Sequence, residues 1–248
     1  MLVVAAAMLA APAWGVEPTA ETGPAFDRYI AAAEKQLRDG AFLYADAHPA
    51  AKAAARKGQT VVVEQRNGEL RVPGGLIHDW LGVSFFPGAR IAGVRALMQD
   101  YESYKRIYTP DVIDSRMLAR DGDRFRVFLR MQNKQLITVT YDSEYEVSYS
   151  APSADRMEVV SHSTRIRQDG NDLGFLWRLN SYWRFAEADG GVYAECRSIS
   201  LSRGIPFGFG WLRGALEKFP RDSMVRTMDA TRRAALVQPE SRNVVTEP

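Results

Sequence analysis

The segment Gly204–Leu236, GIPFGFGWLRGALEKFPRDSMVRTMDATRRAAL, is the stretch that decides the expected fold. Met224, Met228 and Thr231 recur at spacings of four and three, which places them on one face of a helix. Proline suits a first helical turn, so we expect the helix proper to begin at Pro220. A buried face made of methionine and small residues is adaptable. It suits a helix that covers something of variable shape, and an ordinary helix that closes a β core is the alternative.

An aromatic and glycine-rich segment, PFGFGWL, comes before this helix. Phe207 and Trp211 supply apolar bulk, and the glycines at 204, 208 and 210 give the backbone freedom to bend. The sequence therefore predicts a hinge with an apolar tip, whose opening would admit a ligand.

Upstream of the helix, the hydrophobic period is two from Pro110 to Ser202. Short turns such as ADGG separate the alternating runs, so we expect sequential antiparallel strands. The inward-facing parity of residues 157–168 is left open. The expected strands are Val112–Arg120, Val127–Met131, Ile137–Tyr149, Met157–Gln168, Phe175–Phe185 and Val192–Ser202.

Helical and strand patterns also occur before Pro110. Residues 26–37 and 49–57 have helical spacing, and residues 91–108 suggest a pair of short helices. Residues 60–64, TVVVE, predict a strand that RNGE turns into a second strand at Leu70, and a further strand spans Leu76–Phe86.

The first fifteen residues, MLVVAAAMLAAPAWG, form an apolar run that ends in a small-x-small pattern. We expect a signal peptide over residues 1–15 and a periplasmic or secreted protein, although no basic residue precedes the run. The alternative is an alanine-rich tail.

Composition excludes several kinds of function. A net charge of +2 with scattered basic residues gives no footprint for nucleic acid. The single cysteine excludes an intramolecular disulfide, and the three histidines show no metal-binding spacing. GFGWLRG lacks the preceding strand that a dinucleotide site requires. We therefore expect no metal, no cofactor and no catalytic residue of recognisable pattern.

The order of these elements resembles the helix-grip fold of the START-like (SRPBCC) superfamily of polyketide cyclases and lipid-transfer domains. Three stretches carry the likeness: VSFFPGARIAGVRALMQDYESYKRIYTPDVIDSRML, RDGDRFRVFLR and WRFAEADGGVYAECRSISLSR. The resemblance implies an α+β fold in which a curved antiparallel sheet wraps around a long C-terminal helix. The expected domain spans residues 75–237, after an N-terminal extension of helices and strand at 16–74 and before a tail at 238–248.

The resemblance also implies a cavity between the sheet and the helix that binds a hydrophobic ligand, lipid or isoprenoid-like, for transport or presentation in the cell envelope. The expected partners are this small molecule and, transiently, a membrane. Two alternatives stay open, a cyclase-like or aromatase-like enzyme that uses the same cavity and a module whose own side chains fill it; whether the protein is an enzyme is left uncertain, with a non-enzyme favoured. The candidate ligand-binding residues are Val139, Tyr141, Tyr145, Trp177, Trp183, Phe185, Phe207, Trp211, Met224 and Met228.

Overall fold

The antiparallel sheet organises the chain, and the computed structural model describes residues 17–66, 70–133, 138–172, 174–203 and 213–237 of it. In this part of the chain the strands are β1 (Val61–Glu64), β2 (Leu70–Val72), β3 (Gly75–Pro87), β4 (Val112–Asp121), β5 (Arg124–Asn133), β6 (Val139–Ser153), β7 (Arg156–Gln168), β8 (Leu176–Ala188) and β9 (Gly191–Ser202). The helices are α1 (Thr22–Asp39), α2 (Tyr44–Ala47), α3 (Pro49–Arg56), α4 (Ile91–Gln99), the 3₁₀ helix η1 (Tyr101–Ser103), α5 (Tyr104–Ile107) and α6 (Arg213–Val237).

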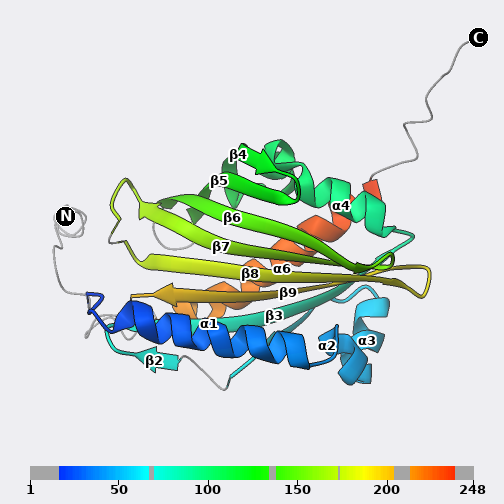
Figure 1. Cartoon of the computed structure of the whole chain (residues 1–248), viewed down its shortest axis with the longest axis horizontal. Helices are drawn as coiled ribbons and strands as arrows, with labels where there is room; N and C mark the ends of the chain where they lie inside the picture. The colour runs from blue at the N-terminus through cyan, green and yellow to red at the C-terminus, as the bar shows by residue number, and fades with distance from the viewer. Residues whose placement is uncertain (1–16, 67–69, 134–137, 173, 204–212, 238–248) are drawn as a thin grey trace, which may run out of the picture.

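The strands pair in the order β1-β3-β9-β8-β7-β6-β5-β4, and β2 also pairs with β3. From β4 to β9 each strand pairs with the next one along the chain, as the period-two pattern predicts. Figure 1 shows α1 on one side of this sheet and α6 on the other. The predicted α+β architecture of an antiparallel sheet packed with a long C-terminal helix is confirmed.

We call the face that carries α6 the inner face. Gly82 of β3 lies directly beneath this helix, because a Cβ atom added there would lie 2.9 Å from side-chain atoms of Met224 and of Met228. Met228 has no exposed surface and belongs to the main hydrophobic core, together with Trp183 and Phe185 of β8. The methionine face predicted for the helix is therefore its sheet-facing side.

We call the opposite side the outer face, and the N-terminal helices cover it (Figure 1). Phe26 of α1 is fully buried in a cluster with Ile77 and Ile199 of the sheet. Beside this cluster, the guanidinium of Arg197 donates to the carboxylate of Asp79 at 2.6 and 2.9 Å, and the Tyr29 hydroxyl of α1 donates to it at 2.7 Å. The N-terminal segment thus forms a second packed layer against the same sheet.

Three local predictions differ from the structure. The helix α6 includes Pro220 in its interior, so it begins before the proline at which we expected it to start. The strands on either side of RNGE both pair with β3, along the same edge, in place of a hairpin with each other. Residues 67–69 of that predicted turn lie outside the described residues. β6 continues through Pro152 to Ser153, and the turn follows at residues 154–155.

Among the described residues, no helix has the length and apolar character needed to cross a bilayer. The predicted signal peptide and C-terminal tail lie outside the described residues.

Candidate ligand-binding cavity

A cavity of about 610 Å³ lies between the inner face of the sheet and α6. Small-molecule sites have volumes of roughly 300–1,000 Å³, so this space suits a ligand of that size. Most of the lining side chains are apolar or aromatic. They are Leu76, Trp80, Met98, Tyr101, Tyr104, Tyr108, Val112, Val127, Leu129, Met131, Tyr141, Tyr145, Val147, Tyr149, Val159, Phe175, Leu176, Leu179, Trp183, Cys196, Met224 and Ala230.

The structure distributes the predicted ligand-binding residues between the cavity and the core beside it. Phe185 and Met228 have no exposed surface and pack in the main core cluster. Val139 is half-buried at the start of β6 and is not among the cavity-lining residues. Phe207 and Trp211 lie outside the described residues, as does the predicted hinge. The predicted residues that line the cavity are Tyr141, Tyr145, Trp183 and Met224.

Trp177 lies away from the cavity and packs against the cluster beneath α1. The reason is a register shift in β8, where Leu176 pairs with Ser202 but Arg178 pairs with Leu201. The extra residue at a β-bulge reverses the alternation of side chains on either side of it. Leu176 therefore takes the cavity position that the uninterrupted period-two pattern assigned to Trp177.

The open parity of residues 157–168 is decided by β7. Val159 and Ser161 line the cavity, and Met157 is buried in the core beside it. A register shift between Glu144 and Tyr145 of β6 interrupts the alternation further along β7. Thr164 is the extra residue of β7 at this shift, because Glu144 pairs with Arg165 and Tyr145 pairs with Ser163. A single alternating pattern therefore could not assign the inward-facing side chains of the whole strand.

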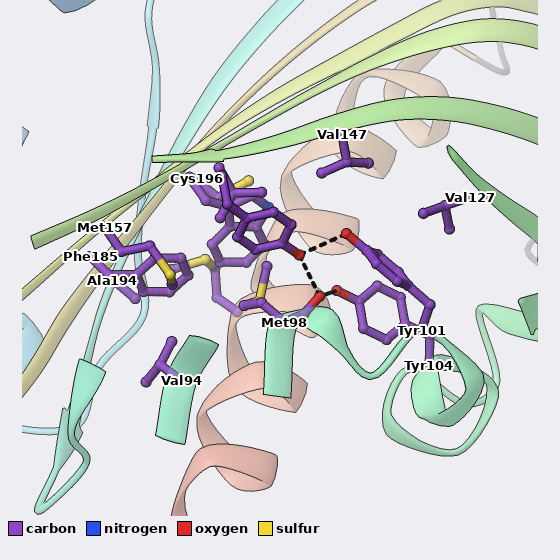
Figure 2. Close-up of a cluster of buried hydrophobic side chains, with 14 of the residues drawn as sticks. Val94, Met98, Tyr101, Tyr104, Val127, Val147, Met157, Phe185, Ala194 and Cys196 are labelled. Atoms are coloured by element: carbon purple, nitrogen blue, oxygen red, sulfur yellow. Dashed lines mark hydrogen bonds between the residues drawn. The ribbon is translucent and has the colours of Figure 1, made fainter. Parts of the chain in front are cut away.

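Four tyrosines that line the cavity form a group that we call the tyrosine cluster: Tyr101, Tyr104, Tyr108 and Tyr149. The hydroxyls of Tyr104 and Tyr149 both donate to the Met98 carbonyl oxygen at 2.6 Å, and Tyr101 donates to the Tyr149 oxygen at 2.7 Å. Figure 2 shows these hydrogen bonds as dashed lines beside Met98. The Tyr108 hydroxyl lies 3.1 Å from the Thr231 hydroxyl of α6.

Burial sets the protonation of this cluster. Desolvation raises the pKa of Tyr108 to about 12 and holds the pKa of Tyr104 well above its usual value. Each phenol therefore stays neutral at physiological pH, with its proton already committed to a protein acceptor or partner. The cluster is a poor source of protons for a reaction and acts as a packed, internally bonded wall.

Four serines on strands β7, β8 and β9, which we call the serine patch, also line the cavity: Ser161, Ser181, Ser198 and Ser200. Ser181 of β8 pairs with Ser161 on one side and with Ser198 on the other, so three hydroxyl-bearing residues lie in one row across three strands. None of the four hydroxyls has a hydrogen-bond partner among the residues that the structure describes. The sequence alone does not reveal this patch, because serines at alternate positions of a strand usually indicate a solvated face.

His78 of β3 continues the serine patch across the sheet, since it pairs with Ser200. Its Nε2 lies 3.1 Å from the Ser202 hydroxyl, and burial lowers the pKa of the imidazole, which favours its neutral form. Neutral His78 could accept or donate one hydrogen bond to a guest. Within the described residues no group of three potential metal ligands comes together, here or elsewhere.

The charged residues that line the cavity in the described part of the chain come from α6 or from the residue before β4: Asp111, Arg226, Asp229 and Arg233. Arg226 donates to Asp111 at 2.7 Å, and both side chains are more than one-third exposed. Arg233 is exposed to solvent. The formal charges thus lie at the rim, and the sheet side of the cavity is neutral.

The sheet and the long C-terminal helix form a helix-grip fold, which solved START-related structures share. No family model matches the sequence, and no curated protein matches it either. Solved structures share the fold at low sequence identity. A STAR-related lipid transfer protein from Xanthomonas axonopodis matches with a TM-score of 0.50 and 15% identity, over 70% of this chain and 98% of that chain.

Two further structures extend this comparison. Human STARD10 matches with a TM-score of 0.50 and 12% identity, over 77% of this chain and 78% of that chain. The Zhui aromatase/cyclase from a Streptomyces species matches with a TM-score of 0.48 and 12% identity, over 64% of this chain and 93% of that chain. At these identities the likeness to the Xanthomonas protein and to STARD10 shows the fold alone, and the function has to be argued from the cavity itself.

Proposed function

We propose that this protein binds a hydrophobic small molecule or lipid in the cavity between the sheet and α6. The observation that carries the proposal is the open volume of about 610 Å³ with a mainly apolar and aromatic lining. Protein interiors are normally packed as densely as organic crystals, and voids larger than a water molecule are few. A space of this size beside a fully buried core is more economically explained by a guest than by imperfect packing.

The driving force for binding would be the removal of apolar surface from water. Each buried methylene contributes about 0.8 kcal/mol, so an acyl or isoprenoid chain gains several kcal/mol before the costs of ordering it are subtracted. The shared fold supports the proposal, because the matching protein from Xanthomonas is described as a lipid transfer protein.

Binding can be tested by cavity filling. The neutral fluorophore N-phenyl-1-naphthylamine is titrated into the delipidated protein and into Leu179→Trp, where the added ring would occupy the cavity that Leu179 lines. Ile113→Trp is the matched control, since Ile113 is 43% exposed on β4 and does not line the cavity. We expect the wild type and the control to enhance fluorescence and the Leu179 variant to lose at least tenfold in affinity. Equal binding by both variants would place the fluorophore elsewhere and contradict the proposal.

A natural ligand can be sought directly by native mass spectrometry of the protein purified from its own cells. A co-purifying mass that is released by organic extraction supports transport or presentation of that molecule. If Leu179→Trp carries the same mass at the same occupancy, the bound molecule is not in this cavity.

We also propose that the protein works in the cell envelope, on the basis of residues 1–15 alone. The first described helix, α1, starts at Thr22, so cleavage after Gly15 would remove no described element. Cell fractionation with N-terminal sequencing tests this location. A mature chain that starts near Val16 in the periplasmic or secreted fraction is expected, and an uncut cytoplasmic chain contradicts it.

A further inference from the structure

The inference concerns the polar group of the ligand, and it rests on the proposed function. The hydroxyls of the serine patch are donors that the protein itself does not use. Ser161, Ser181 and Ser198 occupy directly paired positions on three neighbouring strands. Side chains at paired positions of an antiparallel sheet have Cβ atoms about 4.5–5.5 Å apart. A group that carries two or three oxygen atoms can therefore contact several of these hydroxyls at once.

The surroundings of the patch select against a formal charge. The neighbouring row includes His78, whose pKa burial lowers, and the charged lining residues other than Asp111, namely Arg226, Asp229 and the exposed Arg233, come from α6 and not from the sheet. An ionised carboxylate or phosphate placed on the sheet would lose its hydration without gaining a cation. An uncharged hydroxyl or carbonyl would lose much less and would regain hydrogen bonds from serine.

The side chains directly beside the serine patch offer no comparable site. In the tyrosine cluster the phenolic protons of Tyr104 and Tyr149 are donated to the Met98 carbonyl oxygen. The row of side chains beside the cluster contains Val159 and Trp183, paired across β7 and β8. An apolar body suits these side chains, whereas the polar part of the same molecule suits the neighbouring serine patch.

We propose that the ligand is an uncharged amphiphile, whose hydroxyl or carbonyl oxygens bond to the serine patch while its apolar body lies against the apolar side chains on either side of it, among them Trp183 and Leu179. A molecule with a glycerol, alcohol, ester or ketone group fits this description. A free fatty acid, a phosphate ester and a zwitterionic phospholipid do not.

The test compares two probes with the same acyl chain, 1-monopalmitoylglycerol and palmitate, by displacement of N-phenyl-1-naphthylamine at pH 8. The variant is S181A/S198A, which removes the two paired hydroxyls of β8 and β9. The matched control is S84A/S143A, because the hydroxyls of these two serines also have no partner, but the two residues are buried and do not line the cavity. Neither variant removes a hydrogen bond that the described structure contains, so both are expected to fold.

We expect the wild type and the control to bind the monoglyceride at least tenfold more tightly than palmitate. Two ordinary hydrogen bonds correspond to about a tenfold change in affinity, so S181A/S198A should lose about tenfold for the monoglyceride and little for palmitate. Equal binding of both probes by the wild type, or an undiminished preference in S181A/S198A, overturns the inference and leaves the proposed function standing. Failure of the protein to bind the fluorophore and both probes overturns the proposed function itself.

Discussion

The tyrosine cluster and the serine patch line the same cavity, but they differ in whether their hydroxyl groups have hydrogen-bond partners in the protein. Around Met98 every tyrosine hydroxyl of the cluster has a partner in the protein. In the serine patch none of the four hydroxyls has one among the described residues. The four serines are partly exposed, and their hydroxyls are not among the buried polar atoms without a partner, so they can hydrogen-bond to a molecule in the cavity. The hydroxyls of the tyrosine cluster therefore stabilise the fold, whereas those of the serine patch are available to a guest.

High pH should destabilise the tyrosine cluster, and this is the largest expected effect. The pKa of Tyr108 is about 12 in the folded protein and about 10 in the unfolded chain. Below pH 10 both states keep the phenolic proton, and between pH 10 and pH 12 only the folded state does, so stability falls with rising pH through this window. A shift of this size corresponds to about 3 kcal/mol for one tyrosine.

Urea unfolding at pH 8 and at pH 11.5 measures this loss. Tyr108→Phe removes the titrating group, so its unfolding free energy should depend less steeply on pH than that of the wild type. The same pH dependence in both proteins would show that Tyr108 ionises equally in the folded and unfolded states.

Removing one hydroxyl from the tyrosine cluster should have the next largest effect. Tyr149→Phe leaves the Tyr101 hydroxyl without its acceptor and removes one of two donors from the Met98 carbonyl oxygen. We expect a loss of about 1–3 kcal/mol in the free energy of unfolding. Tyr141→Phe is the control, because Tyr141 lines the same cavity and its hydroxyl has no hydrogen bond within the described structure. If the two variants lose equal stability, the hydrogen bonds around Met98 contribute no more to the free energy of unfolding than the unbonded hydroxyl of Tyr141 does.

Gly82→Ala tests the close contact between helix and sheet. The new methyl group would lie 2.9 Å from side-chain atoms of Met224 and Met228. Methionine is flexible enough to give way in part, so we expect a moderate loss of about 1–2 kcal/mol in the free energy of unfolding. A glycine-to-alanine change without such a contact stabilises a strand, so a gain in stability on urea unfolding would contradict the packing described here.

Ser181→Ala should have the smallest effect on stability, within about 0.5 kcal/mol of the wild type, because no bond in the described structure is lost. Its urea midpoint is compared with that of Ser84→Ala, whose hydroxyl is also without a partner but does not line the cavity. A loss above 1 kcal/mol in Ser181→Ala alone would mean that this hydroxyl is already used in the folded protein.

The sequence predicted the features that depend on hydrophobic period. Alternation over residues 112–202 gave the strands β4 to β9, and the recurrence of Met224 and Met228 gave the buried face of α6. It could not predict features that depend on one extra residue. The bulge at Trp177 moves that side chain to the outer face, and no composition signal marks it.

The candidate site was less predictable than the fold, because the sequence does not show which polar groups find partners. Tyr149 and Ser181 both occur at inward positions of alternating strands, yet only Tyr149 is bonded within the described protein. The start of α6 was also not predictable from Pro220, because the helix begins before this proline although proline usually marks a first turn. These outcomes follow from three-dimensional contacts that are not encoded by local periodicity.

The N-terminal layer that packs on the outer face of the sheet affects the selectivity of the cavity. Phe26, Tyr29 and the pair of Asp79 and Arg197 pack against the outer side of β3 and β9, so the sheet beneath the cavity is held in place by contacts that no guest has to supply. A surface held in this way loses little conformational entropy on association, which favours affinity. Discrimination among guests of different girth then falls to the α6 side of the cavity, where the flexible Met224 lies, while the sheet fixes where each guest places its oxygen atoms.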